Sequence, residues 1–338
     1  MELLGIKFAP LFVPMERRLQ TLAAAAWFIL FVFGGFVGWI LVYHVLFTRF
    51  YPLAILYLLW MAYDQKVYIH GGRRSEWVRN WSCWHYMREY FPIGLVKLED
   101  LPADKNYLFC GYPHGMLCSG AFGNFVAASP EFKRLFPGLT TYLLTLNVHF
   151  NMPIFRELLL CLGSCSSSRE SMTYLLGHPE KGKAVVLMVG GASESLYCHP
   201  GSYKIILKRR KGFIRVALET GAPLVPVFSF GETDVFDQVS NPPGSWLLWL
   251  QSTLKKVLGV APCIPLGRGI FQYSFGIAPR RTPITTVVGR PIMLPQEPNP
   301  SNELVDKYHK IFMEELMELF ETHKGKYLED PKTKLIIE

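Results

Sequence analysis

The sequence predicts an α/β protein in which a mixed, largely parallel sheet is flanked by helices and preceded by an N-terminal membrane helical hairpin. Three observations lead to this prediction: two charge-free apolar runs near the N-terminus, short apolar runs bounded by Gly and Pro beyond residue 100, and amphipathic stretches that alternate with those short runs. Such alternation places helices on the faces of a sheet, because parallel strands need crossover connections.

The composition points to a protein that works at a membrane. Hydrophobic residues make up 50% of the 338 residues and charged residues only 18%, and the mean hydropathy is +0.19. The net charge of +8 is compatible with nucleic acid, anionic lipid or a phosphorylated ligand. No nucleic-acid motif accompanies the charge, so nucleic acid is not expected as a partner. The seven cysteines include no C-x-x-C pair, which predicts reduced thiols.

The first apolar run, residues 22–47, has 26 residues and contains no Asp, Glu, Lys or Arg. About 20 helical residues cross the hydrocarbon core, so this run can span it, and it exceeds the roughly 7–15 residues of a signal-peptide core. The second run, residues 50–63, has 14 residues and is either the returning arm of a hairpin or a segment in the interface. We expect residues 1–21 to be cytosolic and residues 22–63 to be a transmembrane or re-entrant hairpin.

Basic residues predict the orientation of this hairpin. Arg17 and Arg18 precede the first run and four cations follow the second run within residues 66–79, whereas Arg49 stands alone between the runs. Because positive charge is retained on the cytosolic side of membranes, both flanks of the hairpin are expected in the cytosol.

Three tryptophans, Trp77, Trp81 and Trp84, follow at spacings of four and three. These spacings put the indoles on one helical face, as an interfacial anchor requires. Packing of the same face against the globular part is an equally good interpretation. We expect residues 64–100 to form an interfacial helical region and residues 101–338 to form the globular domain.

Within that domain, strands are predicted at residues 107–110, 184–189, 224–230 and 284–288, where β-branched or aromatic residues are concentrated. One helix begins at a capping box formed by residues 167–170, a second covers residues 213–220 and ends at Gly221, and the last begins after Pro300. The last helix has an apolar stripe that predicts core packing: Leu304, Tyr308, Ile311, Phe312, Leu316, Leu319 and Phe320.

The stretch Tyr112-Pro113-His114-Gly115 follows the first of these strands. It places an imidazole between a rigid Pro and a permissive Gly at the end of a buried strand, where α/β proteins usually hold their chemistry. Because the ordinary pKa of histidine lies near neutral pH, His114 is a candidate base; a structural loop histidine is the alternative.

A second candidate, Gly-Gly-Ala-Ser-Glu at residues 190–194, follows the apolar strand at residues 184–189. The glycines at 190 and 191 expose backbone N–H groups. If the two strands are close, Glu194 can hold the Nδ1–H of His114 and leave Nε2 free as a base. Alternatively, Glu194 caps the helix that follows.

Six cations lie within residues 204–215, and no acid interrupts them. Such a cluster at a helix N-terminus suits phosphates of a cofactor or of lipid headgroups. Arg268, between two glycines, is a weaker candidate. The chain has no G-x-S-x-G, P-loop or H-E-x-x-H motif, so a serine hydrolase, a P-loop NTPase and a zincin lose their main support. The six cations are Lys204, Lys208, Arg209, Arg210, Lys211 and Arg215.

Because of these motifs and the stretches given below, the chain resembles the acyl-CoA:monoacylglycerol and diacylglycerol acyltransferase family along nearly its whole length. Residues 8–11 and 16–22 are most similar to the monoacylglycerol branch. The stretches that carry the resemblance are 71–75, 90–93, 113–115, 136–138, 190–194, 210–213, 225–232, 267–269 and 283–289.

The resemblance implies a glycerolipid acyltransferase-like fold for residues 101–338 and an enzyme of the endoplasmic reticulum membrane in which His114 is catalytic. The family motif commonly has His-Pro-His-Gly, whereas Tyr112 stands here in place of the first His. The wider glycerolipid acyltransferases carry an Asp five residues after the catalytic His, and Ser119 occupies that position here. A carboxylate from elsewhere must then orient the ring, which favours Glu194.

The expected reaction moves a fatty acyl group from acyl-CoA to 2-monoacylglycerol, with His114 as base and Glu194 stabilising the imidazolium. Backbone N–H groups near Gly115 or at Gly190 and Gly191 are candidates for binding the oxyanion. The coenzyme A phosphates are expected on Lys208, Arg209, Arg210 and Lys211, with Arg268 as a second candidate. No metal and no permanently bound cofactor is expected, because acyl-CoA is a co-substrate.

Two alternatives remain at this point. Diacylglycerol or a long-chain alcohol could be the acceptor, giving triacylglycerol or wax ester, and a non-catalytic lipid-binding or transfer protein could use the same groove. Expected partners are acyl-CoA, the glyceride and the bilayer, and a homo-oligomer is compatible with the sequence. Association with lipid droplets is a further expectation, with both termini in the cytosol.

Overall fold

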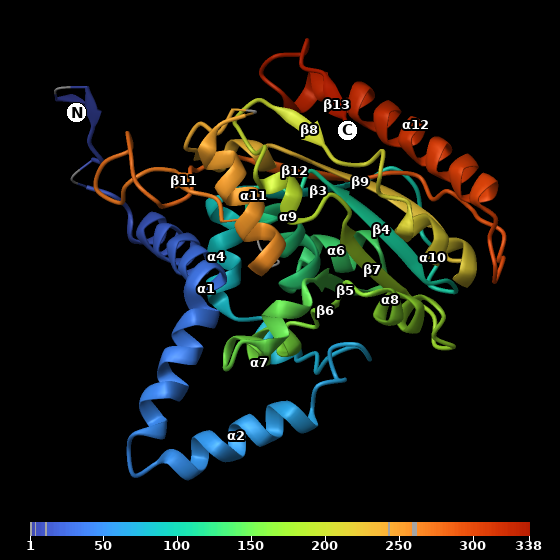
Figure 1. Cartoon of the computed structure of the whole chain (residues 1–338). Coiled ribbons are helices and arrows are strands. Elements are labelled where there is room, and N and C mark those ends of the chain that lie inside the picture. The colour runs from blue at the N-terminus through green and yellow to red at the C-terminus, as the bar shows by residue number, and fades with distance from the viewer. Residues whose placement is uncertain (1, 4, 11, 243, 259–261) are drawn as a thin grey trace.

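The structure, a computed structural model, describes residues 2–338 except 4, 11, 243 and 259–261. Its centre is a seven-stranded sheet in the order β3-β12-β9-β4-β7-β5-β6 (Figure 1). Neighbouring strands are parallel except β12 against β9. The mixed, largely parallel sheet predicted from the sequence is therefore confirmed. Its strands are β3 (Ile93–Lys97), β4 (Tyr107–Tyr112), β5 (Thr140–Thr145), β6 (Cys165–Ser166), β7 (Lys183–Met188), β9 (Leu224–Phe230) and β12 (Ile284–Val288).

The predicted strands correspond to β4, β7, β9 and β12, and the other strands of the sheet were missed. One missed strand, β3, lies inside residues 64–100, which the sequence suggested to be interfacial. It pairs in parallel with β12 and so belongs to the central sheet. Outside that sheet lie three small pairs: β1 (Glu2–Leu3) with β2 (Ile6–Lys7), β8 (Tyr203–Ile205) with β13 (Leu335–Ile337), and β10 (Asp237–Gln238) with β11 (Pro265–Leu266).

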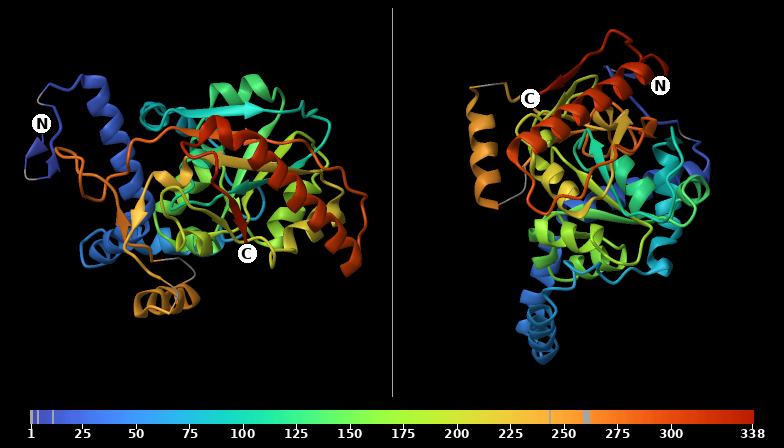
Figure 2. Two further views of the ribbon diagram at one scale, coloured as in Figure 1. Left: turned by 90° about the horizontal axis from the view of Figure 1, so that it is seen from above. Right: turned by 90° about the vertical axis from the view of Figure 1, so that its right-hand side faces the viewer.

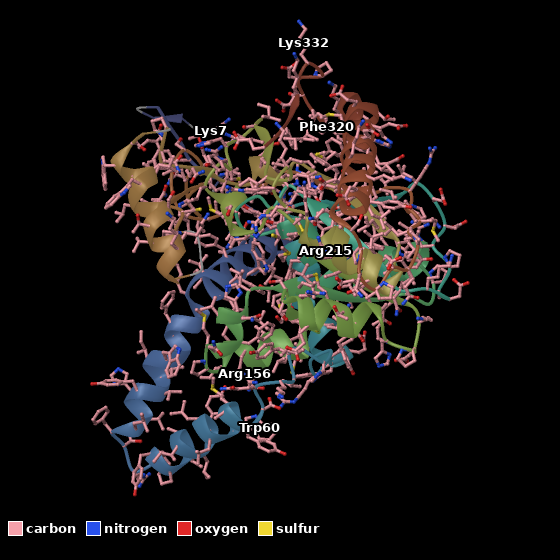
Figure 3. The ribbon with its side chains drawn as sticks, turned by 45° about the vertical axis from the view of Figure 1, so that its right-hand side comes forward. Lys7, Trp60, Arg156, Arg215, Phe320 and Lys332 are labelled. Carbon is pink, nitrogen blue, oxygen red and sulfur yellow. The ribbon has the colours of Figure 1, made fainter. Side chains whose placement is uncertain are left out.

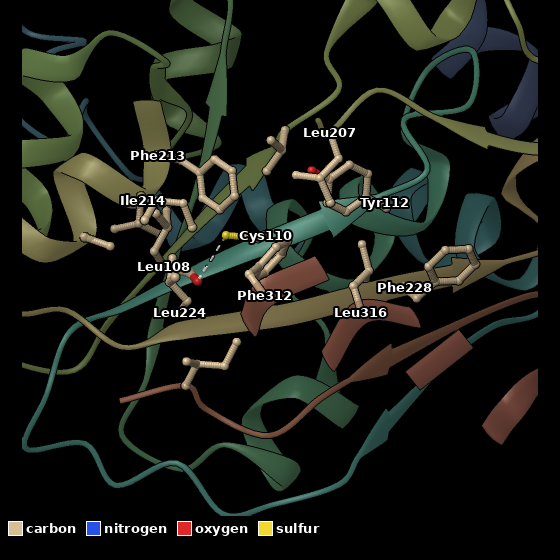
Figure 4. Packing of buried hydrophobic residues seen from close by; sticks show 14 of the residues in the cluster. Leu108, Cys110, Tyr112, Leu207, Phe213, Ile214, Leu224, Phe228, Phe312 and Leu316 are labelled. Atoms are coloured by element: carbon tan, nitrogen blue, oxygen red, sulfur yellow. Dashed lines mark hydrogen bonds between the residues drawn. The ribbon is translucent and has the colours of Figure 1, made fainter. Parts of the chain in front are cut away.

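Strand β4 is buried on both faces, as a central parallel strand requires. Leu108 and Cys110 pack toward α8, α10 and α12 (Figure 4), whereas Phe109 packs toward α5, η1 and α6. Successive side chains of a strand point to opposite faces of the sheet, so β4 contributes to two hydrophobic cores. The bounds of these helices are α5 (Ser119–Ala121), the π-helix η1 (Phe122–Val126), α6 (Pro130–Leu135), α8 (Arg169–Leu176), α10 (Gly212–Thr220) and α12 (Asn302–Tyr327).

Helix ends follow the predicted signals closely. Gly221, at φ +67°, ends α10, and the hydroxyl of Ser301 accepts from the N–H of Leu304 at 3.2 Å to start α12. Helix α8 starts one residue later than the predicted capping box, with Ser168 as its N-cap. The reason is that the N–H of Ser167 still bonds the carbonyl of Thr145 and continues the strand pairing.

Two apolar helices, α1 (Met15–Leu46) and α2 (Tyr51–Tyr63), precede the sheet. Among the described residues, α1 is the helix that is long and apolar enough to cross a membrane, and 33% of its most apolar stretch is buried inside the protein. Figure 1 shows α2 turning back from the far end of α1, with the two helices diverging from the turn. Two consecutive apolar helices are present, but α2 is shorter than a spanning helix, so the predicted membrane hairpin is not confirmed.

Helix α1 is packed against the rest of the protein at its small residues. A Cβ atom on Gly38 would lie 2.0 Å from the carbonyl oxygen of Pro153, so only glycine permits this approach. Nearer its start, α1 buries Trp27 and Phe28. The Trp27 ring lies 5.7 Å from that of Phe122. The segment around Pro153 therefore lies against the C-terminal third of α1.

The C-terminal half of α2 and its C-cap are joined to the domain by polar contacts. Asp64 accepts from Arg156 at 3.0 Å, and the backbone N–H of Ile154 donates to the hydroxyl of Tyr57 at 2.7 Å. Figure 3 shows Arg156 and Trp60 on this side of the molecule. Buried charge pairs of this kind fix where the end of α2 sits on α7. The remaining helices are α7 (Phe155–Cys161), α9 (Ala192–Ser195), α11 (Trp246–Leu258) and the 3₁₀ segments η2 (Asn147–Asn151) and η3 (Glu232–Asp234).

The three tryptophans do not share one helical face, so that prediction is wrong. The chain forms two helices, α3 (Glu76–Arg79) and α4 (Ser82–Tyr90), and Trp81 is the N-cap between them. Trp77 is 73% exposed and Trp84 only 5% exposed. The anchor interpretation therefore fits Trp77, and the core interpretation fits Trp84.

Candidate active site

Four parallel strands end at the same edge of the sheet, and each is followed by a titratable side chain. His114 comes two residues after β4, His149 four after β5, Glu194 six after β7 and Glu232 two after β9. These strands are neighbours in the order β9-β4-β7-β5. The carboxyl edge of a parallel sheet is where α/β proteins bind and transform ligands. The topology therefore brings His114 and Glu194 together, as expected from the sequence.

The imidazole of His114 has a defined orientation. Its Nδ1 lies 3.1 Å from the carbonyl oxygen of Gly115 and 3.1 Å from the hydroxyl of Ser195. A carbonyl oxygen only accepts, so the Nδ1 of the neutral ring carries the proton and Nε2 presents a lone pair. Burial lowers the pKa of His114 below its ordinary value of 6.5, partly offset by the bond to Gly115. The ring is therefore a neutral base at neutral pH.

Glu194 holds the main chain of the histidine and not its ring. Its Oε2 accepts from the backbone N–H of His114 at 2.8 Å, and its Oε1 accepts from the N–H of Ile206 at 2.8 Å. The expectation that Glu194 binds the Nδ1–H is wrong, because both carboxylate oxygens are taken by main-chain amides. The alternative, a cap on its own helix, is not seen either. Ser195, which the sequence analysis passed over, is the side chain that meets the ring.

The glycines of residues 190–194 make room for this carboxylate. A Cβ atom on Gly190 would lie 1.8 Å from Oε1 of Glu194, so any side chain there would displace the acid. Burial raises the pKa of Glu194 to about 7, while the two amide bonds and Arg210 act in the opposite direction. This carboxyl therefore changes its protonation near neutral pH.

A second buried carboxylate, Glu232, supports the other end of the same loop. Its Oε1 and Oε2 accept from the N–H groups of Ser119 and Gly120, both at 2.7 Å. These amides form the start of α5, where a carboxylate satisfies otherwise unpaired donors. Burial raises the pKa of Glu232 to about 7. The motif at residues 225–232 contained this residue, and the Gly-Glu pair after a buried strand was the signal for it.

Ser119 occupies the position at which the resemblance implies an Asp, and Glu232 holds the main chain of this segment, whereas the ring of His114 is met by Gly115 and Ser195. The carboxylate of Glu232 reaches the main chain of Ser119 from another strand. Gly115 packs directly on it, since a Cβ atom there would lie 2.6 Å from Cγ of Glu232. The loop from His114 to Gly120 is thus fixed at both ends by acids from β7 and β9.

Tyr112 points away from this loop. Its ring is buried in the core beside Phe312 of α12, with 6.4 Å between the ring centroids (Figure 4). Burial raises the pKa of its hydroxyl well above the ordinary value, and the hydroxyl has no partner among the described residues. The side chain at this position packs in the core, and the charges of Glu194 and Arg210 act on its hydroxyl.

His149 is a second histidine at this edge and was missed, because its sequence surroundings carry no motif. Its Nδ1 lies 2.9 Å from the hydroxyl of Thr145, and its ring meets that of Phe155 edge-on at 6.1 Å. Burial, with a smaller contribution from the charge of His114, lowers the pKa of His149 to about 4. It is therefore a neutral neighbour of the candidate base.

Backbone N–H groups are available beside His114. Among the described residues, the amides of Gly115, Met116 and Leu117 have no hydrogen-bond acceptor, whereas the amide of Gly191 donates to the carbonyl of Met188 at 3.1 Å. The amide of Gly190 also has no acceptor in this part of the chain. The geometry therefore favours Gly115 and Gly190 over Gly191 as donors to a negatively charged oxygen.

Two basic side chains contact residues 190–194. Arg210 donates to the carbonyl of Gly190 at 3.3 Å, and Lys255 of α11 donates to the hydroxyl of Ser193 at 2.8 Å. Burial, and then the charges of Arg209 and Arg210, lower the pKa of Lys255. Helix α11 stands out from the body in the right-hand view of Figure 2. Lys255 was missed because it is far in sequence from the basic cluster that it joins.

The other predicted cations have separate surroundings. Lys211 pairs with Asp306 at 2.6 Å, and Lys204 pairs with Glu338 at 2.7 Å. The basic segment contains no acid of its own, but acids from α12 and from the C-terminus neutralise two of its cations. Lys208 and Arg209 are exposed, with no ion pair among the described residues.

Arg268 lies near the start of α1. Its Nε donates to the hydroxyl of Tyr90 at 2.9 Å, and its guanidinium also stacks on the ring of Tyr273. These contacts join α4 to the loop after β11. In the described part of the chain, no group of three or more His, Cys, Asp or Glu side chains is placed to hold a metal ion.

Comparison with known proteins agrees with the resemblance noted in the sequence. Residues 43–338 match the family described as diacylglycerol acyltransferase. 2-Acylglycerol O-acyltransferase 1 of Bos taurus is 48% identical over 322 residues, which cover 95% of this chain and 96% of that protein. Diacylglycerol O-acyltransferase 2-like protein 6 of Bos taurus is 45% identical and covers 93% of this chain and 94% of its own. The chain belongs to the diacylglycerol acyltransferase family.

Among solved structures, the 1-acyl-sn-glycerophosphate acyltransferase PlsC of Thermotoga maritima is similar to this chain with a TM-score of 0.39 and 14% sequence identity. The match covers 90% of this chain and 97% of that one.

Proposed function

We propose that this protein transfers a fatty acyl group from acyl-CoA to the free hydroxyl of 2-monoacylglycerol, giving diacylglycerol, with His114 as the general base. The observation that carries the proposal is the tautomer of His114: its Nδ1 faces the carbonyl of Gly115 at 3.1 Å, which leaves the Nε2 lone pair for a substrate proton. Membership of the diacylglycerol acyltransferase family supports the reaction class.

In the proposed step, Nε2 of His114 takes the proton of the glyceride hydroxyl while that oxygen attacks the thioester carbonyl. This attack forms the ester C–O bond, and the backbone amides of Gly115 and Gly190 stabilise the resulting oxyanion. The C–S bond then breaks, and the proton passes from the imidazolium to the thiolate of coenzyme A. General-base catalysis of this kind is typically worth about 10²–10⁴-fold, and holding the two substrates together contributes more. Glu194 acts as a positioning residue, because it holds the backbone of His114.

Coenzyme A phosphates are proposed to bind Lys208, Arg209, Arg210 and Lys211, with Lys255 approaching from α11. Arg210 and Lys255 support this site, because their contacts with Gly190 and Ser193 put cations next to the proposed oxyanion donor. Arg268 remains a secondary candidate, although its guanidinium is engaged by Tyr90 and Tyr273.

The protein is proposed to work in the endoplasmic reticulum membrane, with both termini in the cytosol and with lipid droplets as a second location. The long apolar helix α1 supports this placement. Phe31 of α1 meets Phe155 at 5.6 Å, and Phe155 in turn meets His149 at 6.1 Å. An aromatic path thus connects α1 with the reacting edge of the sheet, which suits lateral entry of the acyl chain and the glyceride from the bilayer.

Purified protein given labelled oleoyl-CoA with 2-monoacylglycerol, diacylglycerol or a long-chain alcohol in parallel tests the acceptor. We expect diacylglycerol to be the main product from the first and the His114→Ala variant to lose transfer while still binding acyl-CoA. Preferred acylation of diacylglycerol or of the alcohol would replace the acceptor in the proposal. Near-normal turnover by His114→Ala would overturn the role of the histidine, and absence of transfer to every acceptor would favour a lipid-binding protein.

A further inference from the structure

A small cavity lies between α3, α4 and α6, apart from the reacting edge of the sheet. It has a volume of about 180 Å³, and its lining includes Arg79, Trp81, His85 and Arg88 but, among the described residues, no Asp or Glu. Arg79 reaches toward Thr141 near the start of β5, whereas the reacting edge lies beyond the ends of the strands. The cavity is therefore a separate positively charged site.

The two arginines of this cavity are deeply buried and incompletely paired. Arg88 is 8% exposed; one of its terminal nitrogens pairs with Glu131, and its Nε–H has no acceptor. Arg79 is 4% exposed and donates from Nη1 to the carbonyl of Leu162 at 3.0 Å and from Nη2 to the hydroxyl of Thr141 at 3.5 Å; its Nε makes no hydrogen bond among the described residues but lies 3.4 Å from Oε1 of Glu76. Nη1 of Arg88 has no hydrogen bond among the described residues, so this buried cation favours a bound oxyanion, and the charge of Arg79 adds to the attraction.

The net charge of the lining points the same way. Burial, followed by repulsion from Arg74, lowers the pKa of Arg79 to about 10, so the group is still a cation at neutral pH. Glu76, 3.4 Å from the Nε of Arg79, is half exposed and lies outside the lining. Guanidinium groups form charge-assisted N–H bonds with phosphate oxygens, which makes phosphate an anion that suits this lining.

Apolar groups beside the cavity indicate where the rest of the ligand lies. The exposed Trp77 ring meets Trp81 edge-on at 5.2 Å, and Trp81 stacks on Trp84 at 6.2 Å. Trp84 in turn meets Phe122, which packs on Trp27 of α1. Indoles in this arrangement, next to a long apolar helix, are typical of the headgroup level of a bilayer.

A wider cavity continues from this one toward α1. It has a volume of about 990 Å³, shares His85, Arg88 and Pro130 with the small cavity, and reaches Arg17 of α1. Unlike the small cavity, it is also lined by the acids Glu16, Glu89 and Glu131. The position that favours an anion is therefore the small cavity, and the wider one connects it with the start of the apolar helix.

We propose that the small cavity binds the headgroup of an anionic phospholipid, with the phosphate between Arg79 and Arg88 and the acyl chains over Trp77 and Trp81. A cavity of about 180 Å³ accommodates a headgroup but not the chains, and the exposed indole of Trp77 lies outside its lining. This lipid is neither the acyl donor nor the acceptor of the proposed reaction, and the site does not depend on that reaction.

Titration of the purified full chain in neutral detergent with water-soluble dihexanoyl phosphatidic acid tests the proposal, with dihexanoyl phosphatidylcholine as the matched lipid. Indole fluorescence reports binding, because Trp81 and Trp84 line the cavity. We expect saturable binding of the phosphatidic acid at least tenfold tighter than that of the phosphatidylcholine. Equal affinity for the two lipids would overturn the proposal.

Variants locate the site. Arg88→Gln is expected to weaken binding of dihexanoyl phosphatidic acid at least tenfold, and Arg134→Gln, which changes an exposed arginine of α6 outside the lining, is expected to leave it unchanged. Glu131→Gln removes the acid that competes for Arg88 and should bind this lipid as tightly or more tightly, so it tests the site even if Arg88→Gln fails to fold. Weaker binding by Glu131→Gln, or equal effects of the two arginine variants, would contradict the proposal.

Two further ligands distinguish the sources of phosphate. Inorganic phosphate that binds as tightly as dihexanoyl phosphatidic acid would show that the lipid part contributes nothing and would overturn the assignment to a phospholipid. Oleoyl-CoA that displaces the bound phosphatidic acid competitively would assign the cavity to the acyl donor and would overturn a separate site. We expect neither result.

Discussion

The backbone N–H of His114 donates a 2.8 Å hydrogen bond to Oε2 of Glu194, so this carboxylate fixes the loop that carries the candidate base. The ring of His114 is held separately, by the carbonyl of Gly115 and the hydroxyl of Ser195. Loop position and ring orientation therefore depend on different side chains, and variants of the two should have different kinetic signatures.

Glu194→Gln should lower turnover by about 10–10³-fold and, because a carboxyl with a pKa of about 7 is removed, should leave an acid limb set by His114 below pH 6.5. The side-chain amide of Gln has a single acceptor oxygen. One of the two backbone N–H groups that the carboxylate now binds, those of His114 and Ile206, would therefore face the NH₂ group, and the loop would shift. Displacement of a catalytic group by about 1 Å can cost about 10²-fold. Rates measured from pH 5 to 8, with unfolding temperature as the control for stability, test this. Unchanged turnover in Glu194→Gln would contradict the positioning role of the acid.

Ser195→Ala should lower turnover by less than about tenfold, because one neutral hydrogen bond is typically worth about 0.5–1.5 kcal/mol and Gly115 still holds the ring. In the unmodified protein, kcat/KM should fall in two steps as pH drops: first near pH 7, where Glu194 is protonated, and then below pH 6.5, where His114 is protonated and only the neutral ring accepts a proton. A pH–rate series of both proteins measures the two effects together. An acid limb above pH 6.5 that persists in Glu194→Gln would contradict a buried neutral base.

The position of the candidate site could be predicted from sequence because its signals are local. Pro-His-Gly and Gly-Gly-Ala-Ser-Glu each follow an apolar strand, and parallel topology brings strand ends together. The contacts of the side chains could not be predicted. Whether Glu194 meets the ring or the main chain of His114 depends on rotamers in a packed interior, and Arg268 finds its partner Tyr90 across 178 residues of chain.

The same distinction applies to the fold. Strands β7, β9 and β12 are runs of β-branched and aromatic residues and were predicted within one residue at each end. Strand β3 was missed because Ile93–Lys97 is short, contains Gly94 and sits in a segment whose tryptophans suggested an interfacial helix. No Gly or Pro marks the end of α3 at Arg79 or the start of α4 after its N-cap Trp81. The spacing of the indoles was therefore misleading, because it assumed a single helix.

Glu232→Gln should flatten the dependence of stability on pH. Burial raises the pKa of Glu232 to about 7 from 4.5 in the unfolded chain, so the protonated carboxyl favours the folded state. Its contribution is fully present below pH 4.5 and is lost as pH rises through about 7, with a slope of at most about 1.4 kcal/mol per pH unit for one proton. The unfolding temperature of the unmodified protein relative to Glu232→Gln should therefore fall from pH 5 to 7 and then level off. A relative stability that rises over this interval would show that the ionised carboxylate is the form favoured by folding.

Gly38→Ala should destabilise the packing of α1, although alanine is intrinsically about 1 kcal/mol better than glycine in a helix. The added Cβ would lie 2.0 Å from the backbone oxygen of Pro153, which cannot move aside as a side chain can, and overpacking of this kind typically costs about 1–3 kcal/mol. Gly34→Ala is the matched control on the same helix, because its Cβ would meet only side-chain atoms of Leu30 and Phe155 at 3.1 and 3.2 Å. We expect a lower unfolding temperature and reduced transfer for Gly38→Ala and small changes for Gly34→Ala. Equal behaviour of the two variants would mean that α1 does not pack on the segment beside Pro153 in the membrane.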